Sequence, residues 1–348
     1  MSNNKFSRRS LLKGSATVAT GAAIGGLGFP ALVRSQQQKR MLKPIVAGLN
    51  GREGDPTDMS IRLIPKILKE KYDVEVNMQI HPASALGTDL SQLDAVQTGF
   101  IDITSNTTTQ FVQYSPDFAY VDLPYVIADW DMALRYFKSD QWNKTAANFE
   151  KKVPVKVLPP VGAGGYRMLW NNVRALPEPG VVNGLKIRSS TAQLEIDLIK
   201  AWGGNATPMA WTETYTGLQT KVVQGFHVQP IWTFQFKMYE QLKFATKVQA
   251  LYAIQFQVMN AATFKAMPES IQKPFLLAAQ EAADIANQKD RELEAHFEGE
   301  LKKVGMEIYT PSSAEMQKWR SAGEKLWDGA KGINKGDVDA MVALRRST

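Results

Sequence analysis

Residues 43–103 read KPIVAGLNGREGDPTDMSIRLIPKILKEKYDVEVNMQIHPASALGTDLSQLDAVQTGFIDI, and strand-like and helix-like segments alternate along them. In the helix-like segments apolar residues recur at helical spacing, as at Ile61, Ile64 and Leu68. This βαβα order predicts a largely parallel sheet in an α/β fold. The predicted elements are Lys43–Gly48, Asp58–Tyr72, Val74–Ile80, Asp89–Gly99 and Phe100–Ile103, followed by a polar loop at Ser105–Phe111.

The same alternation resumes in the second half of the chain, where Gly162–Gly165 predicts a hinge or a tight turn. No flexible linker separates the two α/β halves, so we expect a two-lobed clamshell whose strand ends face each other across a ligand cleft. The expected boundaries are 1–38 for a leader, 39–165 with 254–293 for lobe I, and 166–253 with 294–348 for lobe II and the C-terminal helices. The further predicted strands, after Val155–Pro159, are Arg167–Asn171, Gly184–Arg188 and Tyr252–Asn260. The further predicted helices are Ala192–Trp202, Glu213–Val223, Glu269–Val304, Ser313–Gly329 and Val338–Arg345.

The first residues of the chain predict export from the cytoplasm. Ser7–Lys13 (SRRSLLK) is typical of a twin-arginine signal. The run Gly14–Val33 that follows is rich in glycine, which makes it a poor membrane-spanning helix. A signal peptide that is removed is therefore favoured over an uncleaved anchor, and we expect the mature protein in a periplasm.

Composition excludes several functions. The formal charge of +7 includes five basic residues and no acid from the leader, so the rest of the chain is near +2, and nucleic acid is not an expected partner. The absence of cysteine excludes disulfides, thiol catalysis and thiolate metal sites. About 310 residues remain after the leader, which is the length of two ordinary domains.

The motifs of common enzymes are missing. The histidines (His81, His227 and His296) are far apart, and no HExxH, G-x-S-x-G or Walker sequence occurs. The carboxylates are scattered and indicate no general acid/base pair. We therefore predict neither an enzyme nor a bound metal or cofactor.

Two arginines are candidates for binding an anion. Arg167 lies in an apolar, strand-like setting, and Arg188 ends the strand Gly184–Arg188. A guanidinium at the carboxyl end of a strand faces the cleft, and its planar fork matches a carboxylate. For either arginine the alternative is a solvated or internally paired side chain.

Other candidates flank the same expected cleft. Trp211 precedes a helix that Thr212 is expected to cap, and its ring either covers a ligand or packs into the lobe. From the first lobe, Asn50, Thr88 and Asn106 lie at or just after strand ends, where they contact a ligand or are ordinary loop residues.

Four segments in order resemble the solute-binding proteins of TRAP transporters, the DctP-like family. They are Asp89–Asp102 (DLSQLDAVQTGFID), Ala119–Tyr125 (AYVDLPY), Gly184–Ser189 (GLKIRS) and Thr207–Gly225. The resemblance implies a periplasmic protein that carries a carboxylate to membrane subunits, with a long helix spanning both lobes. It also implies Arg188 as the principal carboxylate ligand, Arg167 as a second arginine nearer the hinge, and Trp211 as an aromatic contact.

One segment departs from the family pattern. Val228 stands where the family commonly has an asparagine, and Trp232 follows. A cleft that loses an amide and gains apolar side chains predicts a mono- or dicarboxylate with an apolar, branched or aromatic body. An exported cofactor-dependent enzyme and a binding protein that serves a sensor are the alternative functions.

Overall fold

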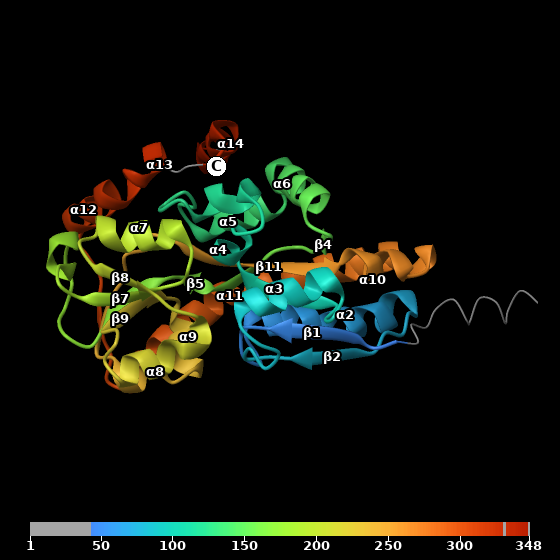
Figure 1. The fold of residues 1–348 in the computed structure, drawn as a ribbon, viewed down its shortest axis with the longest axis horizontal. Helices are drawn as coiled ribbons and strands as arrows, with labels where there is room; N and C mark the ends of the chain where they lie inside the picture. The colour runs from blue at the N-terminus through green and yellow to red at the C-terminus, as the bar shows by residue number, and fades with distance from the viewer. Residues whose placement is uncertain (1–42, 330–331, 347–348) are drawn as a thin grey trace, which may run out of the picture. The chain divides into compact units, whose positions relative to one another are not determined.

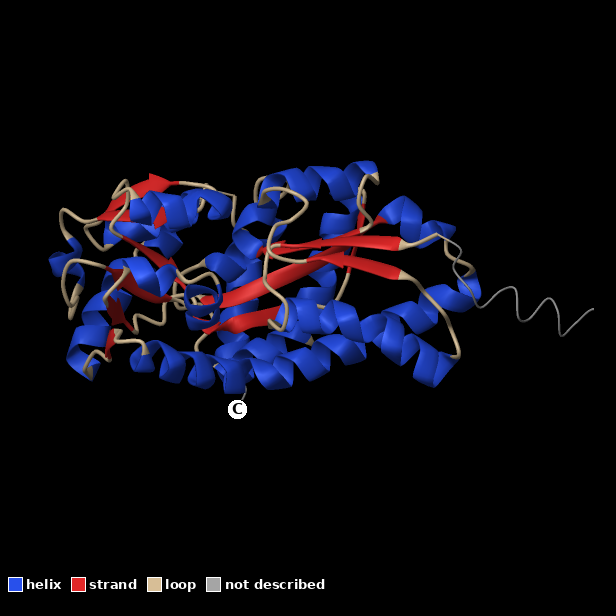
Figure 2. Ribbon diagram, turned by 90° about the horizontal axis from the view of Figure 1, so that it is seen from below, coloured by secondary structure: helices blue, strands red, loops and turns tan. Residues whose placement is uncertain are grey.

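The computed structural model describes residues 43–329 and 332–346. The predicted leader, with its twin-arginine sequence, lies outside the described residues. Within them the strands form two six-stranded sheets, and helices cover the strands on both sides (Figures 1 and 2). No helix in these ranges is long and apolar enough to cross a membrane.

The first sheet has the strand order β2-β1-β3-β11-β4, with β5 also paired to β11. β1 is parallel to β2 and β3, whereas β11 is antiparallel to β3, β4 and β5. The strands are β1 (Ile45–Leu49), β2 (Met78–His81), β3 (Ile103–Thr107), β4 (Val155–Val157), β5 (Val161–Tyr166) and β11 (Tyr252–Asn260).

The second sheet has the order β12-β10-β6-β9-β7-β8. β7 is parallel to β8 and β9, and β10 is parallel to β12, whereas β6 is antiparallel to both of its neighbours. The strands are β6 (Met168–Asn171), β7 (Lys186–Ser189), β8 (Asn205–Pro208), β9 (Gly225–Val228), β10 (Phe244–Thr246) and β12 (Glu307–Tyr309).

Both sheets are therefore mixed: β1, β2 and β3 pair in parallel as their βαβα order predicts, whereas β11 and β6 are antiparallel to their neighbours, so neither sheet is largely parallel as a whole. The reason is the path of the chain between the sheets. It leaves the first sheet along β5 and returns along β11, which pairs with β5 and must run in the opposite direction. A returning strand of this kind cannot be recognised from the local alternation of strands and helices.

The helices alternate with these strands, as the sequence predicts. The α-helices are α2 (Pro56–Tyr72), α3 (Asp89–Thr98), α4 (Thr108–Phe111), α5 (Trp130–Phe137), α6 (Asp140–Lys152), α7 (Gln193–Ala201), α8 (Thr214–Gln219), α9 (Pro230–Gln235), α10 (Ala261–Ala266), α11 (Glu269–Lys303), α12 (Ser313–Glu324), α13 (Leu326–Gly329) and α14 (Lys335–Arg346). The 3-10 helices are η1 (Pro116–Asp122), η2 (Pro179–Val182), η3 (Trp211–Glu213) and η4 (Met238–Gln241).

Residues 105–111 do not form the predicted loop. β3 continues to Thr107, and α4 follows directly. Some of the polar side chains of β3 find partners inside the protein: Thr104 Oγ1 donates to the Gly48 carbonyl at 3.0 Å, and Asn106 Nδ2 donates to Thr104 Oγ1 at 3.0 Å. Ser105 Oγ and Asn106 Oδ1 have no partner within the described residues. Hydrogen bonds inside the protein thus allow a buried strand to contain polar residues, which in the sequence are more typical of a loop.

The glycines at 162–165 form part of β5 and not a turn. Gly164 and Gly165 have φ values of +96° and +87°, which other residues rarely adopt. A Cβ on Gly165 would lie 2.1 Å from Glu294 Oε2 on α11. The glycines therefore allow α11 to approach the strand that leads into the second sheet.

The long helix α11 belongs to both halves of the fold, as expected. Its 35 residues pack against α2 and β5 on the first-sheet side and against α9 on the other. Phe275 and Ala279 lie in the core beside the first sheet, and Leu301 lies in a core of the second sheet. Two sheets with separate cores, joined by this helix, form the two-lobed α/β architecture (Figure 1).

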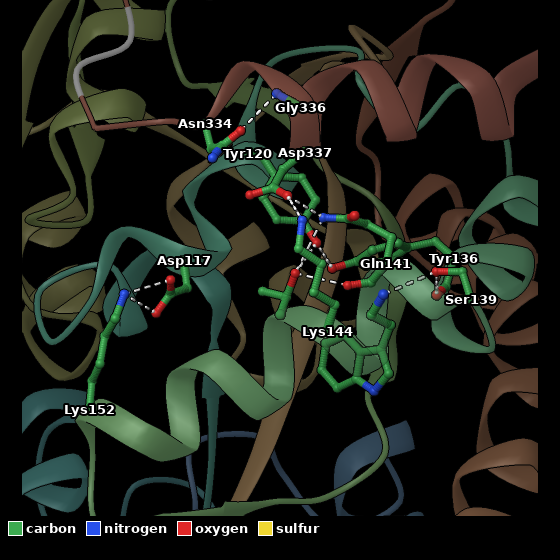
Figure 3. Close-up of polar contacts among 12 residues, drawn as sticks. Asp117, Tyr120, Tyr136, Ser139, Gln141, Lys144, Lys152, Asn334, Gly336 and Asp337 are labelled. Carbon is green, nitrogen blue, oxygen red and sulfur yellow. Dashed lines mark hydrogen bonds and ion pairs between the residues drawn. The ribbon is translucent and has the colours of Figure 1, made fainter.

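The C-terminal helices divide between the two sheets. Trp319 of α12 is buried in a core of the second sheet, whereas Met341 of α14 is buried in a core of the first. Asp337 of α14 fixes this position, because its Oδ1 lies 3.1 Å from Lys144 Nζ and accepts a hydrogen bond of 2.9 Å from Gln141 Nε2 (Figure 3).

Candidate functional site

Arg188 lies near the carboxyl end of β7, between parallel neighbours β8 and β9. Its side chain is almost completely buried. Nε and Nη2 donate to the Met209 carbonyl at 3.1 and 2.9 Å, and the guanidinium carbon lies 5.6 Å from the centre of the Trp211 ring. Nη1 makes no hydrogen bond within the described residues, so one end of the guanidinium fork remains available.

Arg167 lies between β5 and β6 and is paired with an acid. Its Nη1 is 3.2 Å from Glu195 Oε1, and Glu195 Oε2 accepts hydrogen bonds from the backbone N–H and the hydroxyl of Ser190. Burial opposes ionisation of Glu195, but Arg167 and Arg188 outweigh it and lower its pKa below the ordinary value. Glu195 is therefore ionised and neutralises one of the two arginines.

The other acid at the site, Asp89, has a raised pKa. Asp89 starts α3 and is buried, and burial raises its pKa, although Arg188 opposes this change. The two guanidiniums thus share the site with two buried carboxyl groups, of which only Glu195 is in hydrogen-bond contact with an arginine. The free N–H groups of Arg188 can therefore receive the carboxylate of a ligand.

Aromatic residues form one wall of the site. The Trp211 ring centre lies 5.0 Å from that of Trp232 and 5.0 Å from that of Phe236. Trp232 Nε1 donates across the two sheets to Asp55 Oδ2 at 3.3 Å, and Asp55 caps the start of α2. This wall therefore also carries a contact that holds the two sides together.

A small cavity, which we call the arginine cavity, lies between these groups. Asp89, Thr107, Thr109 and Gln110 line it from the first-sheet side, and the arginines, Glu195 and the aromatic residues line it from the other. Its volume is about 20 Å³, close to the space of one water molecule. The two sides thus lie close together around the arginine cavity in this structure.

The structure brings most of the predicted site residues together. The arginine cavity is lined by five of them: Arg188, Arg167, Trp211, Val228 and Trp232.

The three candidates from the first lobe do not line the cavity. Asn50 is buried beside Asp89, where its side chain favours the charged form of the Asp89 carboxyl group. Thr88 is exposed and accepts a hydrogen bond from the Ser91 backbone at the start of α3. Asn106 is buried in β3, where it donates to Thr104.

Gln229 was missed by the sequence reasoning. It follows Val228 directly, precedes α9 and lines the arginine cavity. Its Nε2 is buried and has no hydrogen-bond partner within the described residues. The cavity therefore retains an amide, contrary to the expectation that Val228 removes it, and the neighbouring glutamine in the sequence was the available signal.

The described residues contain no cluster of histidine and acidic side chains that could hold a metal ion. His227 lies behind the site on β9, and burial lowers its pKa to about 3, so its ring is neutral. Glu195 and Ser190, which the sequence reasoning also missed, become functional candidates only through their contact with Arg167 and the cavity.

A sequence model of the DctP family, described as bacterial extracellular solute-binding protein, family 7, matches residues 49–332. The 2,3-diketo-L-gulonate-binding periplasmic protein YiaO of Escherichia coli is 26% identical over 265 residues, 76% of this chain and 80% of the relative. The sialic acid-binding periplasmic protein SiaP of Vibrio cholerae is 25% identical over 281 residues, 80% of this chain and 86% of the relative.

Solved structures have the same fold. The sugar acid binding protein DctPAm of Advenella mimigardefordensis superposes with a TM-score of 0.83 at 20% identity, covering 88% of this chain and 99% of that one. A TRAP periplasmic solute-binding protein of Sulfurospirillum deleyianum gives a TM-score of 0.81 at 19% identity, covering 88% and 99%. The family description names binding proteins and not enzymes. This chain belongs to the DctP family of bacterial extracellular solute-binding proteins.

Proposed function

We propose that this protein captures a small organic acid between its lobes, with the carboxylate held at the arginine cavity, and delivers it to the membrane subunits of a TRAP-type permease. The observation that carries the proposal is Arg188, a buried guanidinium with one free N–H face between the two sheets. We further propose that the chain is exported by its twin-arginine sequence and acts in the periplasm after removal of the leader.

The ligands named for related proteins agree with an organic acid. The relatives bind 2,3-diketo-L-gulonate and sialic acid, and solved structures of the fold contain succinate, D-erythronate and galactonate. All of these compounds carry a carboxylate. An arginine can bind a carboxylate through two parallel charge-assisted hydrogen bonds, which are strong enough to offset the loss of its hydration.

The charges of the cavity favour a single carboxylate. Glu195 already neutralises Arg167, so only Arg188 lacks an acidic hydrogen-bond partner. Val228, Trp211 and Trp232 give the cavity an apolar wall, and Gln229 adds one free amide. This combination suits a monocarboxylate with an apolar or aromatic body better than a highly hydroxylated acid.

Release requires the two sides to separate. We propose that the two lobes move as the halves of a clamshell, with the boundaries expected from the sequence (39–165 with 254–293, and 166–253 with 294–348) except that α14 packs on lobe I. Contacts between the two sides must then break, among them the Trp232–Asp55 hydrogen bond, the 2.9 Å hydrogen bond from Gln113 Nε2 to Thr191 Oγ1, and the contact of the Arg52 guanidinium with the Phe236 ring. The membrane partner would receive the ligand from this opening form.

Calorimetric titration of the variant Arg188→Ala tests the proposal. The probes are acetate, phenylacetate and succinate, with phenylacetamide as the uncharged analogue. We expect a carboxylate to bind the wild type and the amide to fail, and we expect Arg188→Ala to lose about 2–5 kcal/mol of affinity. Lys186→Ala is the matched control, because Lys186 is exposed on the same strand. Equal affinity of the two variants would remove Arg188 from the site and refute the proposed function.

A further inference from the structure

A second cavity between the two sides lies next to the arginine cavity and is open to solvent. Its volume is about 400 Å³, and the two cavities share the Trp211 side chain. The loop before α2 and the residues after β2 line it from the first-sheet side, and residues between 211 and 240 line it from the other. We call it the Arg52 cavity, after an exposed residue that lines it.

The charged side chains of the Arg52 cavity are mostly positive. Arg52 and Lys237 are exposed cations, Glu240 is the acid among the lining residues, and the remaining lining residues are neutral. Glu240 Oε2 accepts a hydrogen bond of 2.6 Å from the Tyr215 hydroxyl, so this acid is directed to a neutral neighbour within the cavity wall. The cavity therefore presents two cations and one carboxylate to the surrounding water.

Neither cation forms an ion pair with an acid of residues 43–329 and 332–346. The Arg52 guanidinium contacts a ring instead, with its carbon 4.6 Å from the centre of the Phe236 ring. Glu53 follows Arg52 in the chain, but its Oε1 lies 3.8 Å from a nitrogen of another arginine, Arg62. A single exposed cation is ordinary, whereas two unpaired cations beside a cleft that receives anions attract those anions from solution.

Another cavity that adjoins the arginine cavity has the opposite charge. It has a volume of about 470 Å³ and shares Thr109 with the arginine cavity. Two acids line it, Asp122 and Asp197, and none of its lining residues is a lysine or an arginine. The Asp197 carboxylate accepts a hydrogen bond of 2.8 Å from Gln193, which leaves its negative charge in place. An approaching anion is therefore repelled here and attracted at the Arg52 cavity.

The position of Arg52 does not depend on its contact with Phe236. Arg52 lies in the loop between β1 and α2, whereas Phe236 ends α9 on the other side. Backbone hydrogen bonds hold this loop: the Asp55 N–H donates to the Arg52 carbonyl at 3.1 Å, and the Ala83 N–H donates to the Gly51 carbonyl at 2.6 Å. Separation of the two sides removes the ring from the guanidinium and leaves Arg52 at the edge of the opened cleft, where it can meet an anion.

We propose that the Arg52 cavity is the entrance of the cleft, where Arg52 and Lys237 attract the carboxylate of an arriving organic acid and direct it to Arg188. Arg52 and Lys237 act on the rate of entry, whereas Arg188 holds the bound ligand. This inference rests on the proposed function, because it takes Arg188 to be the carboxylate ligand. It assigns a role to two cations that the carboxylate site itself does not use.

Stopped-flow fluorescence measures the association and dissociation rate constants, because Trp211 and Trp232 line the arginine cavity and report on binding. The probes are phenylacetate, which carries one negative charge, and succinate, which carries two at pH 8. The variants are Arg52→Gln and Lys237→Gln. Lys66→Gln is the matched control, because Lys66 is an exposed cation on α2 and does not line the Arg52 cavity.

The expected effect is on association and depends on salt. A unit charge about 7 Å from a carboxylate in water changes its energy by about RT, so each variant should slow phenylacetate about threefold in about 10 mM salt, and succinate more. In about 1 M salt, where the Debye length is about 3 Å, the rates should converge with that of the wild type. Arg52→Lys keeps the charge and should associate as fast as the wild type. The dissociation rate of Lys237→Gln should be unchanged.

The contrary results separate this inference from the proposed function. If the two cavity variants associate as fast as the wild type in low salt, or are slowed equally in low and high salt, Arg52 and Lys237 do not attract the ligand and the inference is wrong. Equal slowing by Lys66→Gln would show that only the net charge of the protein matters, which also overturns it. If neither acid binds the wild type, or Arg188→Ala binds them as tightly, the proposed function fails and the inference fails with it.

Discussion

Replacing Asp290 with asparagine should change how the stability of the protein depends on pH. Asp290 is fully buried on α11, where its carboxyl group accepts hydrogen bonds from the Gly164 N–H and the Tyr252 hydroxyl. Within the described residues no lysine or arginine pairs with it. Burial raises its pKa from 3.8 to about 6, against the opposing effect of these hydrogen bonds.

The sign and size of the effect follow from this shift. Between pH 4 and pH 6 the unfolded chain loses the Asp290 proton while the folded protein keeps it, so the free energy of unfolding falls as the pH rises. A shift of roughly two pKa units corresponds to about 3 kcal/mol. That contribution is fully present below pH 4 and is lost once the pH exceeds the folded pKa of about 6.

Urea unfolding of the wild type and Asp290→Asn at pH 4, 5, 6, 7 and 8 measures the effect. The variant cannot ionise at this position, so its stability relative to the wild type should improve by about 3 kcal/mol from pH 4 to pH 8. Asp284→Asn is the matched control, because Asp284 lies on the same helix, partly exposed and 3.1 Å from Lys138. If the difference between Asp290→Asn and the wild type is constant across this range, the reasoning from burial is refuted.

Three further changes probe the cleft and its surroundings. Arg188→Lys should weaken carboxylate binding in calorimetry, because an ammonium cannot copy the fork of a guanidinium, and unchanged affinity would contradict a bidentate contact. Trp232→Phe keeps a ring but removes the hydrogen bond to Asp55, so small-angle scattering of the ligand-free protein should show a larger radius of gyration than the wild type; an identical radius would show that this bond does not hold the closed form. Gly165→Ala should lower the melting temperature measured by circular dichroism, since the new Cβ meets Glu294 and the backbone has a φ of +87°.

The architecture could be predicted from the sequence because its strands and helices are regular. The bounds predicted for β1, α2 and α3 from residues 43–103 lie close to the observed bounds, and residues 252–260 form β11 as expected. The direction of β11 could not be predicted, because it depends on the return of the chain from the second sheet and on no local pattern. Polar β3 was mistaken for a loop because its hydrogen-bond partners are distant in sequence.

The site residues that could be predicted are those whose side chains bind an anion by their own chemistry. Arg188 and Arg167 are strand-associated arginines in apolar surroundings, and both line the cavity. Glu195 could not be identified, because a glutamate in the first turn of a helix is ordinary and only the fold places it 3.2 Å from Arg167. Thr88 shows the opposite error, since a polar residue next to a helix start is more often a cap than a ligand contact.

The pairing of Arg167 with Glu195 explains why two arginines do not require two anionic groups on the ligand. An internal carboxylate satisfies the arginine beside the β5–β6 junction whether or not a ligand is present. Arg188 lies close enough to Glu195 and Asp89 to feel their charges, but its only hydrogen bonds are the two that it donates to the Met209 carbonyl. A ligand shifts the equilibrium towards closure only by binding the closed form more tightly than the open one. Arg188 provides this difference, because its interaction with a carboxylate is strongest when both sides exclude water from the cavity.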